Sequence, residues 1–118
     1  MEVQVFGLKN DSETRKAQRF FAERRVKVHF VDLQQRPIAP GELKRFVQKL
    51  GVTALVNTRA KRYADLGLAH QRLTEERWIE RLCGDPALLL LPLARCGQQL
   101  TIGAAEATWK AWVEESKA

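Results

Sequence analysis

The sequence has few cysteines and no long apolar run. Its two cysteines, Cys83 and Cys96, are separated by twelve residues, so neither a Cys-x-x-Cys pair nor zinc-site spacing is present. We therefore expect no metal and no other cofactor. The longest apolar stretch, residues 87–91, is far shorter than the ~20 residues that span a bilayer. Because the N-terminus also has no basic region followed by an apolar run, we expect a cytoplasmic protein with no membrane partner.

The composition is that of one ordinary globular domain. The chain has 118 residues, of which 45% are hydrophobic and 29% are charged, and it contains no repeat or low-complexity segment. We therefore predict a single domain over residues 1–118.

The basic character of the chain raises the hypothesis of nucleic-acid binding. The formal net charge is +6 and the sequence pI is about 9.7. The positive charges are nevertheless spread along the chain, and the densest groups, residues 24–27 and 59–62, are not interleaved with the aromatic residues that stack on bases. We expect these groups to be solvated helix ends and faces, and nucleic-acid binding stays a weaker alternative.

The first third of the chain predicts a strand–helix–strand unit. Residues 2–6 form a short apolar strand, a helix begins at about Asp11, and residues 26–31 alternate between apolar and polar side chains. Asn10 is a good N-cap, and Glu13 three residues later completes a capping box. A helix that crosses between two such strands places them parallel.

The rest of the chain predicts helices followed by a hairpin and a last helix. The apolar spacing and the capping residues favour helical segments at 42–50, 52–57, 75–83 and 104–116, with a restart at Asp85-Pro86. Residues 92–95 and 99–102 read as strands that are joined by a turn at 96–98. The predicted fold class is α/β: a mixed four-stranded sheet, made of a parallel βαβ unit and an antiparallel hairpin, packed with helices.

Four segments, taken in order, carry a resemblance to a known family. They are residues 5–17, the second strand ending at Asp32, residues 55–59 (Leu-Val-Asn-Thr-Arg), and Leu91-Pro92 followed by a hairpin that ends near Gly103. The whole chain resembles the thioredoxin-fold family that contains glutaredoxin-linked arsenate reductases and Spx-type transcription regulators. The resemblance implies a thioredoxin-like fold.

The same resemblance identifies where a redox site would lie. The reductases place their nucleophilic cysteine directly after the asparagine that Asn10 matches, and this chain has Asp11 there. An Spx-type switch would need a second cysteine three residues further on, where the chain has Thr14. The resemblance therefore implies a family member without the N-terminal redox cysteine.

The resemblance also identifies the positions of the oxyanion-binding arginines. Arg59 matches the first of three, whereas Leu91 and Ala104 occupy the positions of the second and third; Arg15 matches an arginine of the helix. The resemblance further implies that Pro92 is a cis proline beside the former active site, near the start of the first helix.

Chemistry argues in the same direction as the resemblance. Arsenate reduction begins with attack by a thiolate, and a carboxylate cannot supply that sulfur chemistry. Asp11 is instead expected to be a negative cap on the first helix, with Arg59 or Arg15 as its ionic partner. We therefore predict no catalytic residue in this region.

We expect a non-catalytic protein-binding or regulatory module, and the Spx resemblance implies a protein partner from the transcription machinery. Two alternatives stay open. One is a thiol oxidoreductase with a displaced thiol at Cys96, which lies in the predicted turn beside Arg95. The other is a nucleic-acid-binding protein that uses the basic residues 59–62 and Arg72.

Overall fold

The structure is a computed structural model that describes residues 1–117. These residues form two compact units, one made of residues 1–36 together with the chain from Leu91 onward, the other of residues 37–90. The single domain over residues 1–118 stays a prediction.

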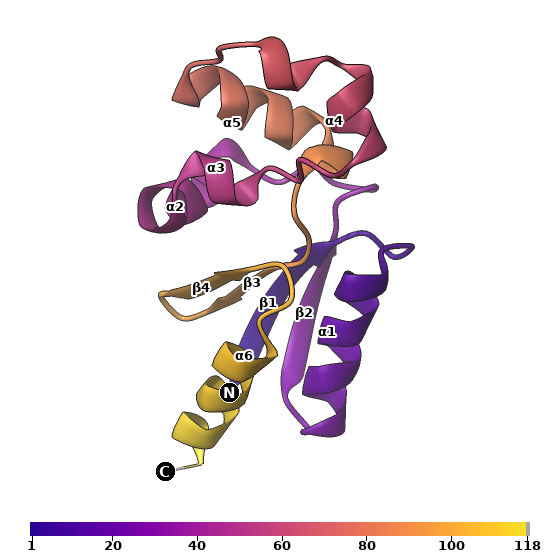
Figure 1. The fold of residues 1–118 in the computed structure, drawn as a ribbon. Helices are drawn as coiled ribbons and strands as arrows, with labels where there is room; N and C mark the ends of the chain where they lie inside the picture. Colours follow the sequence, from indigo (N-terminus) through magenta and orange to yellow (C-terminus); the bar gives the residue numbers. More distant parts are fainter. Residues whose placement is uncertain (118) are drawn as a thin grey trace. The chain divides into compact units, whose positions relative to one another are not determined.

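The first unit is built on a four-stranded mixed sheet (Figure 1). Its elements are β1 (Glu2–Gly7), α1 (Ser12–Glu23), β2 (Lys27–Asp32), β3 (Leu93–Cys96), β4 (Gln99–Ile102) and α6 (Glu106–Ser116). The strand order is β2-β1-β3-β4, in which β1 runs parallel to β2 and antiparallel to β3, while β3 and β4 form the antiparallel hairpin. The predicted βαβ unit and hairpin are thereby confirmed.

The core of this unit lies between one face of the sheet and the two helices α1 and α6. Because side chains alternate along β1, Val3 and Val5 point to the same face, and both are fully buried. Aromatic residues of the two helices pack there, with ring centroids of Phe21 and Trp109 5.5 Å apart. Trp109 also donates a buried hydrogen bond of 2.8 Å from Nε1 to Thr101 Oγ1, which ties α6 to β4.

The second unit is helical. Its elements are α2 (Pro40–Leu50), α3 (Val52–Leu55), α4 (Lys61–Asp65), the 3₁₀ turn η1 (Leu68–His70), α5 (Glu75–Gly84) and the 3₁₀ turn η2 (Pro86–Leu88). The apolar spacing of α2 buries Leu43, Phe46 and Val47, whereas Leu50, which has the same helical spacing, is 41% exposed. No helix in residues 1–117 is long and apolar enough to cross a membrane.

The predicted restart at Asp85-Pro86 is confirmed, with Asp85 as the N-cap residue of the turn that begins at Pro86. The Asp85 side chain makes no cap hydrogen bond, and its Oδ2 accepts a hydrogen bond of 2.6 Å from Nε of Arg62. One local prediction was wrong. Cys96, expected in a turn, is the last residue of β3 and pairs with Gln99. The hairpin loop is therefore Gly97 with the residue after it, and Gly97 has the positive φ (62°) that favours glycine.

Candidate functional site

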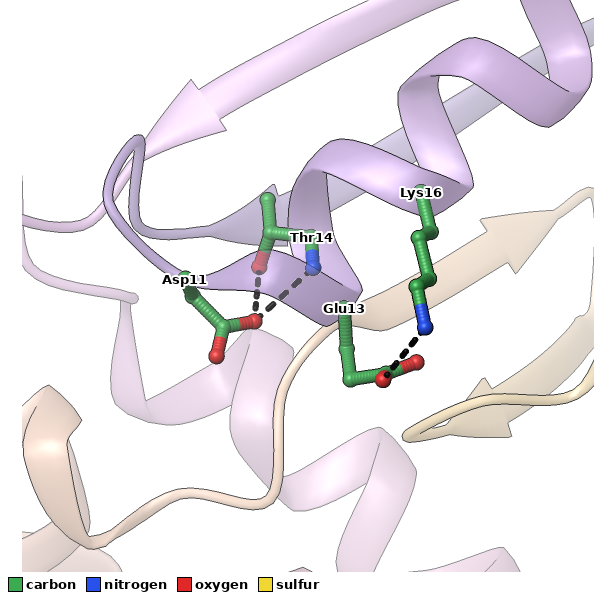
Figure 2. Close-up of polar contacts among 4 residues, drawn as sticks. All are labelled: Asp11, Glu13, Thr14 and Lys16. Atoms are coloured by element: carbon green, nitrogen blue, oxygen red, sulfur yellow. Dashed lines mark hydrogen bonds and ion pairs between the residues drawn. The ribbon is translucent and has the colours of Figure 1, made fainter.

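The candidate site lies where β1 ends and α1 begins. The chain turns directly after Gly7, with a hydrogen bond of 3.0 Å from the backbone N–H of Asp11 to the carbonyl of Leu8. Asp11 has an extended backbone and is the N-cap of α1. Its Oδ2 accepts two hydrogen bonds from Thr14, one from the backbone N–H (2.8 Å) and one from the hydroxyl Oγ1 (2.7 Å) (Figure 2). The predicted negative cap at Asp11 is confirmed.

The predicted capping box was wrong by one residue. Asn10 is exposed and lies outside the helix, and Glu13 does not reach back to it but pairs with Lys16 at 3.4 Å (Figure 2). Asparagine and aspartate are equally good N-caps in general. Here the cap carries a negative charge, which interacts favourably with the positive end of the helix dipole.

Thr14 and Gly7 form a close contact beneath this cap. The Thr14 side chain is fully buried, and a Cβ added at Gly7 would lie less than 3.0 Å from its Oγ1 and Cγ2 atoms. Only glycine leaves room for Thr14 to donate to Asp11. Sequence reasoning missed this three-residue arrangement, and the single available signal was a glycine directly after an apolar strand.

The hairpin brings a second predicted residue to this end of the sheet. The Leu91-Pro92 peptide bond is cis, as predicted. Since Phe6 pairs with Leu93 in antiparallel register, Pro92 comes opposite Gly7, and its carbonyl accepts a hydrogen bond of 2.8 Å from the backbone N–H of Gly103. Pro92 therefore lies at the edge of the sheet at which β1 leads into the turn before α1.

The residues at the three predicted arginine positions differ in their surroundings. The Leu91 side chain is 7% exposed, and Ala104 is exposed. Arg59 is exposed and lies in the helical unit, where its backbone N–H donates to Asn57 Oδ1 at 3.2 Å. Its proposed role as a partner of Asp11 stays a prediction.

Arg15, the other predicted partner of Asp11, does not pair with it. Arg15 is exposed, and within residues 1–117 no ion pair joins the two side chains. The cations near carboxylates here are Lys9, whose Nζ is 3.9 Å from Asp32 Oδ2, and Lys16, whose Nζ is 3.4 Å from Glu13 Oε1. The site thus presents three carboxylates, of which Asp11 is committed to capping α1.

A comparison with known proteins now decides the family. A family model described as the ArsC family matches residues 6–112. The chain belongs to the ArsC family. The match includes the end of β1, the cap at Asp11, β2, the cis proline and the hairpin. The fold is the thioredoxin-like fold of that family.

Individual relatives agree with this assignment. The uncharacterized protein YusI of Bacillus subtilis (strain 168) is 27% identical over 93 residues, which cover 75% of this chain and 79% of YusI. The structure of the YffB protein matches with a TM-score of 0.85 at 21% identity, covering 92% of this chain and 96% of YffB. An arsenate reductase from Vibrio cholerae matches with a TM-score of 0.77 at 22% identity, covering 87% of this chain and 90% of the reductase.

Both thiols of this ArsC-family chain are unfavourably placed for nucleophilic chemistry. Cys83 lies in α5 and Cys96 in β3, both half-buried and neither in a disulfide. Burial raises the pKa of each thiol above its ordinary value of 9.0; for Cys96, the N-terminal ammonium opposes this rise and Glu115 adds to it. Both groups are therefore mainly neutral thiols at neutral pH, and the reactive thiolate is scarce.

The neighbouring arginine does not change this conclusion. The Nε of Arg95 donates to the carbonyl of Gly97 at 2.9 Å.

No side-chain cluster in residues 1–117 combines three or more His, Cys, Asp or Glu residues in a way that could hold a metal ion.

Proposed function

We propose that this chain is a non-catalytic member of the ArsC family that acts as a protein-binding or regulatory module. The observation that carries the proposal is the cap at Asp11. Its Oδ2 accepts both hydrogen bonds of Thr14, so one free N–H of the first turn of α1 is capped by a negative charge of the chain itself. By the family resemblance, this is the position at which a reductase carries its nucleophilic sulfur.

The charge at this position argues against an oxyanion substrate. A helix N-terminus can bind an anion through its free N–H groups and the helix dipole. Asp11 occupies one of those N–H groups and repels an incoming anion. Leu91 is buried and Ala104 carries no charge, so two of the three positions that the resemblance assigns to oxyanion-binding arginines offer no cation.

The two alternatives gain no support from the geometry. A displaced-thiol oxidoreductase would use Cys96, but burial raises the pKa of this thiol and so lowers its thiolate fraction. A nucleic-acid-binding protein would use residues 59–62 and Arg72, but Arg62 is held in an ion pair with Asp85 at 2.6 Å. We therefore prefer the binding module, with a partner from the transcription machinery as the Spx resemblance implies.

The proposal is tested by capturing partners from the native cell. The chain, and a Cys83→Ser/Cys96→Ser variant, are each tagged, cross-linked with a lysine-reactive reagent and analysed by mass spectrometry. We expect the same protein to be captured in near-equal amount to both baits, because binding does not depend on thiols. Capture that requires either cysteine would contradict the proposal and favour a thiol-exchange enzyme.

A further inference from the structure

The segment around α1 carries an excess of positive over negative charge. Residues 9–27 contain seven basic and three acidic residues, a net charge of +4 out of the formal +6 of the whole chain. Three of these basic side chains, Arg15, Lys16 and Arg19, project from the solvent-exposed side of α1, opposite its buried residues Ala17 and Phe21. We call these three residues the α1 basic face.

Two residues of the α1 basic face, Arg15 and Arg19, do not stabilise their own helix. Cations stabilise a helix near its C-terminus, but the last turn of α1 holds no basic residue. Arg15 and Arg19 are four residues apart, so their like charges repel. Neither makes a side-chain hydrogen bond or ion pair among residues 1–117, whereas Lys16 pairs with Glu13 at 3.4 Å.

A groove lies directly beside this face. Its volume is about 340 Å³, and α1 and α6 line it, both in the sheet-containing unit. The lining residues are Lys16, Arg19, Phe20, Glu23, Arg24 and Glu106. Arg24 is fixed there, with its guanidinium carbon 3.7 Å from the centroid of the Phe20 ring and an N–H donated to the Phe20 carbonyl at 3.0 Å. The groove thus has three cations against two carboxylates.

We propose that the α1 basic face and this groove form a docking surface for an acidic segment of a partner protein. The inference rests on the proposed function and specifies which surface it uses. Arg15 and Arg19 are one turn apart, about 6 Å along the helix axis. Carboxylates on alternate residues of an extended segment are spaced by about 6.6 Å. Each can therefore meet one guanidinium in a bidentate pair, which relieves the repulsion between the two arginines.

The test is a binding titration by fluorescence anisotropy at fixed, low ionic strength. The probe is a fluorescein-labelled peptide of alternating Glu and Ser. The variant is Arg15→Glu/Arg19→Glu, and the matched control is Arg45→Glu/Arg77→Glu. The control changes the net charge equally, at two exposed arginines of the helical unit that make no side-chain hydrogen bond or ion pair among residues 1–117.

We expect the α1 variant to bind the peptide roughly tenfold more weakly and the control to stay within about twofold of the wild type. A second variant, Arg15→Gln/Arg19→Gln, adds no negative charge near Asp11 and replaces the first if the reversed charges unfold the helix. We expect it to give an intermediate loss of binding. Circular dichroism confirms folding of each variant.

Three results would overturn the docking surface: no binding of the peptide, equal losses in both variants, or tighter binding of an oligothymidylate with the same dependence on Arg15 and Arg19. These results concern only the docking surface. If one of them is found while the chain still captures its partner independently of its thiols, the proposed function stands and only the docking surface is wrong.

Discussion

At the scale of single residues, the cap of α1 depends on one carboxylate. Asp11→Ala removes the acceptor of both Thr14 hydrogen bonds, and loss of an N-cap costs about 0.5–2 kcal/mol of unfolding free energy. Urea denaturation at neutral pH measures this loss. The control is Asn10→Ala, which changes an exposed residue outside the helix and should stay within about 0.5 kcal/mol. A larger loss of unfolding free energy in Asn10→Ala than in Asp11→Ala would show that Asn10 is the N-cap, as expected from the sequence.

Gly7 is the residue that lets Thr14 reach this cap. Gly7→Ala places a methyl group less than 3.0 Å from the Thr14 side chain, and such overpacking typically costs about 1–3 kcal/mol. Thr14→Ala removes the atoms in the way, so the double variant should lose less stability than the sum of the two single variants. Strict additivity in a denaturation double-mutant cycle would show that the two residues do not meet.

The Cys96 thiol should be slow to react at neutral pH. Burial raises its pKa above 9.0, so the thiolate fraction lies below that of a free cysteine and grows only as the pH rises toward that pKa. In a Cys83→Ser variant, alkylation by iodoacetamide should therefore be slower than that of glutathione at pH 7 and should accelerate steadily up to pH 9. A rate that is already maximal at pH 7 would contradict this placement.

Part of the site was predictable at this scale, and the limit has a physical cause. The carboxylate cap and the cis proline followed from Asp11 and from the resemblance at Pro92. Which of Asn10 and Asp11 is the N-cap of α1 did not follow from the sequence, because both side chains cap well. The contact that decides it is the hydrogen bond from the buried hydroxyl of Thr14 to Asp11. That contact depends on the space left by Gly7, which no local spacing rule encodes.

At the scale of helices and strands, the strongest patterns predicted the structure best. The four strands and the long helices were placed within a few residues, since their apolar periods match the faces that they bury. The sequence predicted no helix over α4 or the turn η1. Neither segment is long enough to show a helical period, and only Leu68 is buried among their residues.

One hydrogen bond between elements should be measurable in the stability of the sheet unit. Thr101→Val keeps the shape of the side chain but removes the acceptor of the buried Trp109 Nε1–H. An unsatisfied buried donor costs about 1–3 kcal/mol, and thermal or urea unfolding followed by tryptophan fluorescence measures it. Thr101→Ser retains the hydroxyl and should lose less stability than Thr101→Val. Equal losses in the two variants would assign the effect to the methyl group alone.

At the scale of the whole molecule, element order predicted that the sheet is mixed, because a βαβ unit places β1 and β2 in parallel and the hairpin strands are antiparallel. The strand order was not predicted: the structure adds the hairpin through β3 to the free side of β1. The partner could not be predicted in this way. The proposed docking depends on where exposed charges such as Arg15 and Arg19 come together on a surface, and this is set by helix orientation rather than by the overall count of charges.

The central claim, that this ArsC-family chain is not an arsenate reductase, has a direct test. Arsenate reduction is measured with glutathione and glutaredoxin for the wild type, for Asp11→Cys and for Cys96→Ser, with the Vibrio cholerae arsenate reductase as the positive control. We predict no turnover by the wild type. We also predict none by Asp11→Cys, because its thiol, although acidified by the helix N-terminus, has no arginine at Leu91 or Ala104 to hold the oxyanion. Wild-type turnover that disappears in Cys96→Ser would contradict the account.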